Sequence, residues 1–536
     1  MSGLDSVSAM SAQYDGEWVI SSLIDDRAER LGDRRAVTAP EGHLTYAELR
    51  DRAQRVAGAL VALGVAPGDR VATMLGPSLD YLGAWFGVAW AGAVEVPVNV
   101  DFKGEFLRHV LAGSSARVLV VDERWLGRLD GLDLPDLHAV VIVGGPGEAP
   151  GNRLALSFEE ALAHAPLPRV PREEYDLAYL MYTSGTTGAS KGAMHSNRSA
   201  LWNVRSWIDI LELTSADIAY SMFPLFHVTA RSAVVTSAIW AGAPIVLRDG
   251  FSPVRFWDDV RESGATYFAY MGAVIHLLWS QPERPDDAAN AVRRAFGAAA
   301  PPALAEAFER RFGIRLIEVY GSTELGPATA PYPGKERRGT MGVVCPHVEL
   351  EIHDDLDRRV PAGTLGEIVA RPTGPHTLFL GYWSEPEATL HAFRNLWFHT
   401  GDQGRFDEDG FLTFTDRIRD SIRRRGENIS SFEVEQSVQA YAPVLECAAY
   451  AVPSELTEDE VMIAVVQRDG MSVDPAGLLA HCIEVIPRFA VPRYVRIVAA
   501  LPKTPSQRIQ KYKLRSEGIT PDTVDRDAIG IVVPRS

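Results

Sequence analysis

Cysteine, long apolar runs and surplus positive charge are all scarce in this chain of 536 residues. The three cysteines, Cys345, Cys447 and Cys482, show no CxxC spacing, which argues against a disulfide framework or a zinc site. The most apolar stretch (YLGAWFGVAWAGAV, residues 81–94) is shorter than the roughly 20 residues that a membrane span needs, so it predicts a buried helix. With 53 basic and 70 acidic residues, the net charge is -17 and disfavours nonspecific binding to nucleic acid or an anionic membrane.

The amino-terminal residues are polar and acidic (MSGLDSVSAMSAQYDGEW), without the basic and then apolar pattern of an export signal. Widely spaced thiols favour a reducing compartment, so we expect a cytoplasmic protein. The length and the 46% hydrophobic content indicate a globular chain with two or more domains. The sequence does not decide between a monomer and a homodimer.

Strand and helix signals alternate along the first part of the chain. Thr45 and Glu48 form a capping-box pattern, and the helix that they predict ends at Gly64. Short apolar runs follow, among them VATML (71–75), VEVPV (94–98), ARVLVV (116–121) and LIEVY (316–320). This alternation predicts an α/β fold, a layered N-terminal body with largely parallel sheets.

The pattern changes toward the carboxyl end. From about Gly363, short runs separated by Gly, Pro and Asp predict a β-rich subdomain of the large N-terminal domain. Beyond Asp416, two helical and three strand-like segments predict a small α+β unit. We place the boundary between an N-terminal domain of residues 1–418 and a C-terminal domain of residues 419–536.

The most informative segment is YTSGTTGASKG at residues 182–192, which lies between the apolar run LAYLM and a helix that we expect to be capped by Ser196 or Asn197. Its glycines allow tight turns that point N–H groups inward, its small hydroxyls add donors and Lys191 adds a charge. Such a loop suits a polyphosphate, although the spacing is not that of the nucleoside-triphosphatase P-loop. The alternative is a flexible surface linker.

This loop resembles the phosphate loop of the adenylate-forming superfamily, which contains acyl-CoA synthetases, nonribosomal adenylation domains and firefly-type luciferases. Four further regions resemble the family in the same order: LTYAEL with GDRVA (44–49 and 68–72), YGSTELG (320–326), GDQGRFDEDGFLTFTDRIRD (401–420) and RRRGENISSFEVE (423–435). The resemblance covers nearly the whole chain. YFAYMGAVIHLLWSQP (267–282) is similar to the crotonobetaine or carnitine-CoA ligase subgroup.

The resemblance implies a ligase that uses ATP, Mg²⁺ and CoA. A carboxylate would attack the α-phosphate of ATP to give an acyl adenylate and pyrophosphate, and the thiol of CoA would then displace AMP. The family pattern assigns catalysis to Lys191, Thr323, Glu324 and Arg508, with Glu324 also as the metal ligand. It assigns ATP or AMP binding to Thr183, Ser184, Gly185, Thr186, Thr187, Gly188, Gly297, Ala298, Ala299, Tyr320, Gly321, Ser322, Asp402 and Arg417. Within this set, Gly297, Ala298, Ala299 and Tyr320 would lie beside the adenine, and Asp402 would bind the ribose with Arg417 close by.

The same resemblance implies that the C-terminal domain is mobile, with its hinge at Arg419 and a CoA contact at Gly426. It assigns the acyl pocket to His227, Tyr270, Met271 and Gly272.

Each role has a simpler structural alternative. Taken alone, Asp402 could be an ordinary Asx-turn residue and Glu324 a solvated carboxylate. His227 alone could be a core histidine whose hydrogen bonds are satisfied. Arg231 would either pair with an anionic substrate tail or cap a pocket edge that faces water.

One motif departs from the family. LPKTPSQRIQKYKLR (501–515) resembles a segment close to LPKTPTGKIQK, but Gln507 replaces the glycine and Arg508 the lysine that bridges carboxylate and α-phosphate. Arginine keeps the charge but has a bulkier, planar head, and Lys511 is a second available cation.

Two other functions compete with the CoA ligase. One is a standalone adenylation enzyme that loads a carrier protein, and the other is a degenerate nucleotide-binding protein. The CoA-ligase-like RRRGEN and the intact Lys191, Glu324 and Asp402 favour the acyl-CoA ligase.

Overall fold

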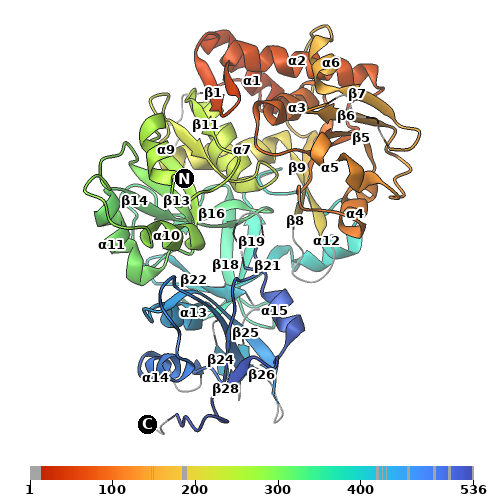
Figure 1. Ribbon diagram of the computed structural model, residues 1–536. Coiled ribbons are helices and arrows are strands. Elements are labelled where there is room, and N and C mark those ends of the chain that lie inside the picture. The colour runs from red at the N-terminus through yellow and green to blue at the C-terminus, as the bar shows by residue number, and fades with distance from the viewer. Residues whose placement is uncertain are drawn as a thin grey trace.

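The computed structural model describes residues 14–145, 148, 150–183, 190–417, 422–424, 427–429, 431–454, 459–486, 490–504, 507 and 509–533. Two seven-stranded sheets form the upper body in Figure 1, and a smaller α+β unit lies below them. The predicted α/β class with a β-rich part and a small α+β part is confirmed.

The first sheet contains the predicted strands of the amino-terminal third. Its order is β7-β6-β5-β3-β4-β8-β9, and all neighbours are parallel except the antiparallel pair β8 and β9. Its strands are β3 (Arg70–Met74), β4 (Val94–Pro97), β5 (Ala116–Asp122), β6 (Ala139–Val143), β7 (Leu154–Ser157), β8 (Leu177–Thr183) and β9 (Lys191–Ser196). Its central strands are apolar on both faces because helices cover both sides.

The second sheet has the order β14-β13-β12-β10-β11-β1-β2 and is parallel except for β2. Its strands are β1 (Arg35–Ala39), β2 (Gly42–Thr45), β10 (Ala219–Ser221), β11 (Ile245–Leu247), β12 (Tyr267–Met271), β13 (Arg294–Ala298) and β14 (Arg315–Glu318). Since the carboxyl ends of parallel strands share one edge, residues that follow β12, β13 and β14 come together there.

The helices begin where the sequence predicts. Helix α2 (Tyr46–Ala62) has the complete Thr45 and Glu48 capping box, and α3 (Leu79–Trp90), the apolar stretch, is buried against α2. The others in this body are α1 (Ile20–Leu31), α4 (Glu105–Gly113), α5 (Glu123–Leu126), α6 (Phe158–Ala163), α7 (Asn197–Leu211), α8 (Ser237–Ala241), α9 (Phe256–Ser263), α10 (Gly272–Trp279) and α11 (Pro302–Phe312), with the 3₁₀ turn η1 (Gly127–Leu129) and the π-helical η2 (Thr229–Thr236).

The β-rich part begins earlier than Gly363. Two antiparallel sheets follow β14, because short strands joined by turns start directly after it. They contain β15 (Tyr320–Ser322), β16 (Gly326–Ala330) and β17 (Val343–Val344), and then β18 (Val348–His353), β19 (Gly366–Pro372), β20 (Phe393–Arg394), β21 (Trp397–Phe406) and β22 (Leu412–Arg417), with helix α12 (Pro386–Ala392).

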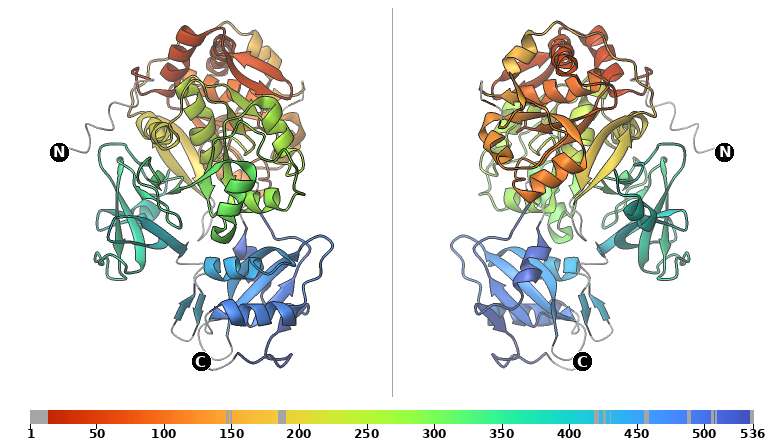
Figure 2. Two further views of the ribbon diagram at one scale, coloured as in Figure 1. Left: turned by 90° about the vertical axis from the view of Figure 1, so that its left-hand side faces the viewer. Right: turned by 90° about the vertical axis from the view of Figure 1, so that its right-hand side faces the viewer.

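The C-terminal unit has apolar clusters of its own, made of residues from 422 onward. It forms the lower lobe in Figure 2. It contains β23 (Ile422–Arg424), β24 (Glu427–Ile429), α13 (Ser431–Gln439), β25 (Val444–Pro453), β26 (Asp459–Gln467), α14 (Pro475–Val485), β27 (Tyr494–Ile497), α15 (Lys511–Glu517) and β28 (Thr523–Asp525).

Asp416 and His276, from the N-terminal part of the described chain, both contact this unit. The carboxylate Oδ2 of Asp416 accepts a hydrogen bond from the Ser431 N–H at 2.7 Å, and the His276 Nε2 lies 2.9 Å from the Gln439 Oε1. Residues 418–421, where the predicted boundary and the Arg419 hinge fall, lie outside the described residues, so both stay predictions. In the part of the chain that the structure describes, no helix is long and apolar enough to cross a membrane.

Candidate active site

The predicted phosphate loop joins two antiparallel strands. Thr183 and Lys191 pair across β8 and β9, and the Thr183 hydroxyl donates to the Lys191 carbonyl at 3.5 Å. Ser196 caps α7 as predicted, but β9 separates the loop from that helix, so the helix dipole does not reach the loop. Strand β9 was not predicted from the sequence; it forms because the residues from Lys191 onward pair with β8. Ser184, Gly185, Thr186, Thr187 and Gly188 lie outside the described residues.

Lys191 and Glu324 meet through a residue that the sequence did not reveal. The Lys191 ammonium lies 5.2 Å from the centre of the Tyr382 ring, and the Tyr382 hydroxyl donates to the Glu324 Oε1 at 3.1 Å. These three residues are far apart in the sequence, and no spacing or periodicity pointed to Tyr382. Glu324 is therefore not simply a solvated carboxylate.

Thr323 lies in the turn between β15 and β16, next to a buried histidine. The His195 ring contacts the Thr323 backbone and lies 3.2 Å from the Ser199 hydroxyl. Burial lowers the pKa of His195 to about 4, so this ring is neutral at neutral pH. Gly321, in the predicted nucleotide motif with Ser322, must be glycine because a Cβ there would lie 2.1 Å from the Gly326 carbonyl oxygen.

The predicted adenine segment and the predicted acyl pocket are neighbours at the edge of the second sheet. Tyr270 pairs with Gly297, and Met271 pairs with Ala298. A Cβ on Gly297 would lie 2.0 Å from the Tyr270 carbonyl oxygen, so the two strand ends approach too closely for a side chain there.

Ala299, the residue that follows β13, has a left-handed backbone with φ of 64°. A Cβ on Gly272 would lie 2.1 Å from the carbonyl oxygen of Ala299, which requires glycine at that position. The Glu318 Oε1, from β14, accepts hydrogen bonds from the Ala300 N–H at 3.0 Å and from the Tyr270 hydroxyl. Burial raises the pKa of Glu318 to about 7, and sequence reasoning had not singled it out.

Asp402 lies within strand β21 and not in a turn, so the Asx-turn alternative is wrong. Its Oδ2 accepts a hydrogen bond from the Tyr320 hydroxyl at 3.0 Å, which joins the predicted ribose and adenine motifs. The backbone of Arg417, in β22, lies opposite that of Asp402, in β21, so the two residues are close as predicted. The carboxylate of Glu367 accepts a hydrogen bond from the N–H of Gly401, the residue before Asp402, at 3.0 Å.

His227 precedes the π-helical segment η2. Burial lowers its pKa to about 4, and its ring packs on Phe226 with centroids 4.6 Å apart. Its buried Nε2 has no hydrogen-bond partner among the described residues, which disfavours the alternative of a satisfied core histidine.

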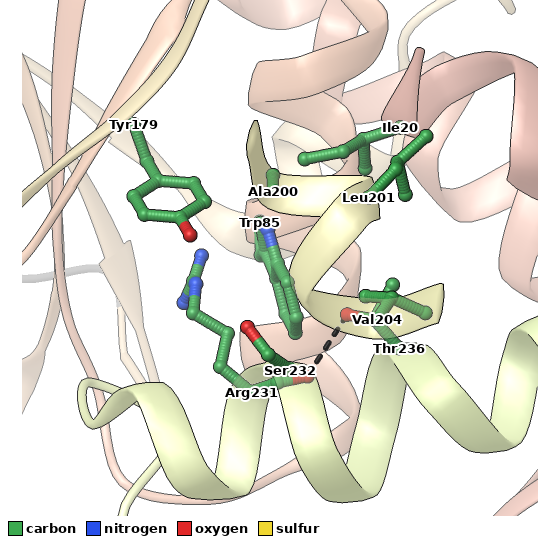
Figure 3. A pocket seen from close by; sticks show the side chains of 9 residues that line it. All are labelled: Ile20, Trp85, Tyr179, Ala200, Leu201, Val204, Arg231, Ser232 and Thr236. Atoms are coloured by element: carbon green, nitrogen blue, oxygen red, sulfur yellow. Dashed lines mark hydrogen bonds between the residues drawn. The ribbon is translucent and has the colours of Figure 1, made fainter. Parts of the chain in front are cut away.

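Both interpretations of Arg231 from the sequence, as a substrate ligand and as a cap that faces water, are wrong. Its side chain is 1% exposed and pairs with Glu95, whose side chain is 2% exposed, so it neither caps a wet edge nor awaits a substrate tail. Figure 3 shows its guanidinium between Tyr179 and Trp85, and its carbon Cζ lies 3.7 Å from the Trp85 ring centre. Burial lowers the pKa of Arg231 to about 10, which leaves it charged at neutral pH.

The basic segment near the carboxyl end is tied to its own domain. Lys503 forms an ion pair with Glu446, and the Lys511 Nζ lies 2.8 Å from a Glu435 oxygen with both side chains 14% exposed. Lys511 is therefore ion-paired with Glu435 and is not the second available cation that the sequence suggested. Arg508 and Gly426 lie outside the described residues.

Family comparisons agree with this geometry. A family model described as AMP-binding enzyme matches residues 24–383, and one described as AMP-binding enzyme C-terminal domain matches residues 433–508. The crotonobetaine/carnitine–CoA ligase of Salmonella paratyphi A is 31% identical over 512 residues, which cover 92% of this chain and 98% of that protein.

Solved structures show the same architecture. The anthranilate CoA ligase AuaEII in complex with anthranoyl-AMP has a TM-score of 0.86 and 25% identity, covering 95% of this chain and 98% of its own. ATP-bound MatB from Rhodopseudomonas palustris has a TM-score of 0.83 and 26% identity, covering 93% and 98%. The chain therefore belongs to the AMP-binding enzymes, in the class of AMP-forming acyl-CoA ligases. This finding favours CoA ligation over carrier-protein loading and over nucleotide binding without catalysis.

Proposed function

We propose that this ligase activates a monocarboxylic acid whose remaining body is uncharged, using Mg²⁺ and ATP, and transfers the acyl group to CoA. The observation that carries the substrate class is the absence of an uncompensated charge at His227 and Arg231, on one side of the predicted acyl pocket. His227 is neutral because burial lowers its pKa to about 4, and Arg231, one turn later, is paired with Glu95. A second charge on the acid would therefore lack a counter-charge from these residues.

In the first half-reaction, a carboxylate oxygen of the acid attacks the α-phosphorus of ATP and pyrophosphate leaves. Negative charge spreads over the phosphate oxygens in this transition state, so fixed cations and donors stabilise it. Lys191 and Thr183, which lie opposite each other where β8 and β9 meet the loop, would bind the β- and γ-phosphates. Thr323 would bind the α-phosphate, and Asp402 would accept hydrogen bonds from the ribose.

Glu324 fits a magnesium ligand. Its carboxylate is only partly buried, and a hydrogen bond from Tyr382 fixes one of its oxygens. Among the described residues, no group of three or more His, Cys, Asp or Glu side chains could enclose a metal ion. This suits Mg²⁺, which is commonly held by one or two carboxylates together with substrate phosphates and water. Bound there, Mg²⁺ would neutralise charge on the phosphates.

In the second half-reaction, the CoA thiolate attacks the acyl carbon, the acyl–oxygen bond breaks and AMP leaves. Gly426 would line the path of the thiol after rotation about Arg419. Arg508 would supply the cation of the first half-reaction, since Lys503 and Lys511 are held by Glu446 and Glu435.

The test is mass spectrometry of the enzyme with ATP, Mg²⁺, CoA and a panel of benzoate, anthranilate, hexanoate, malonate, carnitine and crotonobetaine. We expect acyl-CoA and AMP from acids with an uncharged body, with kcat/KM at least tenfold above that for charged ones. Preference for crotonobetaine or malonate would contradict the neutral-pocket proposal, and an adenylate without thioester would contradict CoA transfer.

Location and assembly complete the proposal. The three cysteines are all buried free thiols, which suits the reducing cytoplasm. Light scattering of the purified chain would distinguish a monomer from a homodimer.

A further inference from the structure

Tyr382 separates two groups of opposite charge. Its ring faces the Lys191 ammonium at 5.2 Å, and its hydroxyl donates to the Glu324 Oε1 at 3.1 Å. In the part of the chain that the structure describes, the Lys191 ammonium contacts this aromatic ring and not a carboxylate. A direct pair between Lys191 and Glu324 would neutralise both groups, whereas a tyrosine between them leaves each charge directed toward a ligand.

The backbone holds Tyr382 in this position. Residues 379–383 run beside β9: the Trp383 N–H donates to the Gly192 carbonyl at 2.8 Å, and Tyr382 bridges Ala193. At the other end, the Phe379 N–H donates to the Glu324 carbonyl at 3.0 Å. The segment is thus fixed to the strand that begins with Lys191 and to the residue that would bind the metal.

The side chain of Tyr382 is also restrained. Its ring packs on Phe379 with centroids 5.2 Å apart. The backbone N–H of Tyr382 donates to the Thr389 hydroxyl at 2.9 Å. A tyrosine hydroxyl is protonated at neutral pH, so it can act as the donor to Glu324.

We propose that Tyr382 is a positioning residue that keeps Lys191 and Glu324 apart and oriented, so that the ammonium meets the ATP phosphates and the carboxylate meets Mg²⁺. This inference rests on the proposed function, because it takes those two ligands as given. A cation over an aromatic face and a hydrogen bond to a carboxylate each contribute modestly, so the expected effects on binding are several-fold.

The test measures ATP binding by calorimetry without the acid, first in EDTA and then across a Mg²⁺ titration. Tyr382→Phe removes only the hydroxyl, so we expect a threefold to tenfold higher Mg²⁺ requirement and unchanged ATP affinity in EDTA. Tyr382→Leu also removes the ring and lets Lys191 pair with Glu324, so ATP affinity in EDTA should fall about tenfold. Tyr175→Phe, a half-exposed tyrosine outside the site, is the matched control and should change neither quantity.

Glu324→Gln and Lys191→Ala separate the possible failures. If these two variants shift Mg²⁺ dependence and ATP affinity while both Tyr382 variants match the wild type, the role of Tyr382 is wrong and the proposed function stands. If neither benchmark moves either quantity, the ligand placement in the proposed function is wrong, and the inference falls with it. Equal losses in both readouts, accompanied by a lower melting temperature, would show that Tyr382 only supports the fold.

Discussion

Two clusters of charge in the N-terminal body look alike in composition but differ in burial and pairing. Arg231 and Glu95 form a closed pair with side chains 1% and 2% exposed, while Lys191 and Glu324 are partly exposed and separated by Tyr382. Neighbouring groups add hydrogen bonds to the closed pair: the Arg231 Nη1 donates to the Leu225 carbonyl at 3.0 Å, and the Glu95 Oε1 accepts from the Thr73 hydroxyl at 2.8 Å.

The difference shows how a charged residue serves the fold or the chemistry. A buried charge must be matched by the protein, because transfer from water is costly. A charge that acts on a substrate must instead be left uncompensated until the ligand arrives. The sequence suggested for Arg231 either a substrate ligand or a cap that faces water, because its residue type is visible there and its partner, 136 positions away, is not.

The largest expected effect follows from removing one partner of the buried Arg231–Glu95 pair. Glu95→Ala leaves the Arg231 guanidinium buried without its counter-charge, so the free energy of unfolding should fall by about 3–5 kcal/mol. Urea denaturation monitored by tryptophan fluorescence would measure it. A loss below about 1 kcal/mol would mean that Arg231 gains solvent or another partner.

The second prediction concerns the open cluster. Lys191→Ala should lower the rate of pyrophosphate exchange by about 10²–10³, because it removes a cation that stabilises the transition state. Its unfolding free energy should match the wild type within about 0.5 kcal/mol, since a partly exposed lysine contributes little to stability. Lys335→Ala, at an exposed position, is the control for both measurements. If the Lys191 variant unfolded, Lys191 would instead be a residue that stabilises the fold, as Arg231 and Glu95 do.

The third prediction uses pH. Burial lowers the pKa of His195, His227 and His347 to about 4 in each case. Unfolded histidine has a pKa of about 6.5, so between these values the unfolded chain binds more protons and stability falls as the pH falls. Each histidine should contribute a slope of up to about 1.4 kcal/mol per pH unit between pH 6.5 and 4.

Urea denaturation of the wild type and of His227→Phe at pH 7, 6 and 5 would measure this slope. The variant should lose stability less steeply over this range. Parallel curves would mean that the ring of His227 is protonated in the folded protein.

The sequence predicted much of this molecule, and the reasons for its failures are physical. Local signals identified the capping box of α2 and the start of α7, because their partners lie three residues away. The site residues were assigned by family resemblance, and the structure brings Lys191 near Glu324 and Asp402 near Tyr320, while their roles stay predictions. Tyr382, Glu318 and the pairing of Arg231 could not be predicted, since each depends on contacts between segments that only the folded sheets bring together.

The smallest expected effect comes from replacing both partners of the buried pair, and it distinguishes the two charge clusters most directly. Replacing the closed pair as a unit, Glu95→Leu with Arg231→Met, removes both charges and keeps the volume apolar. The free energy of unfolding should then lie within about 1 kcal/mol of the wild type, because buried ion pairs often exchange for apolar residues at little cost. Pyrophosphate exchange should be unchanged, since neither residue meets the substrate. The same treatment of Lys191 and Glu324 should abolish exchange while the fold persists. If the Leu and Met variant instead lost activity with its stability intact, the pair would serve the acyl pocket through the loop that carries His227.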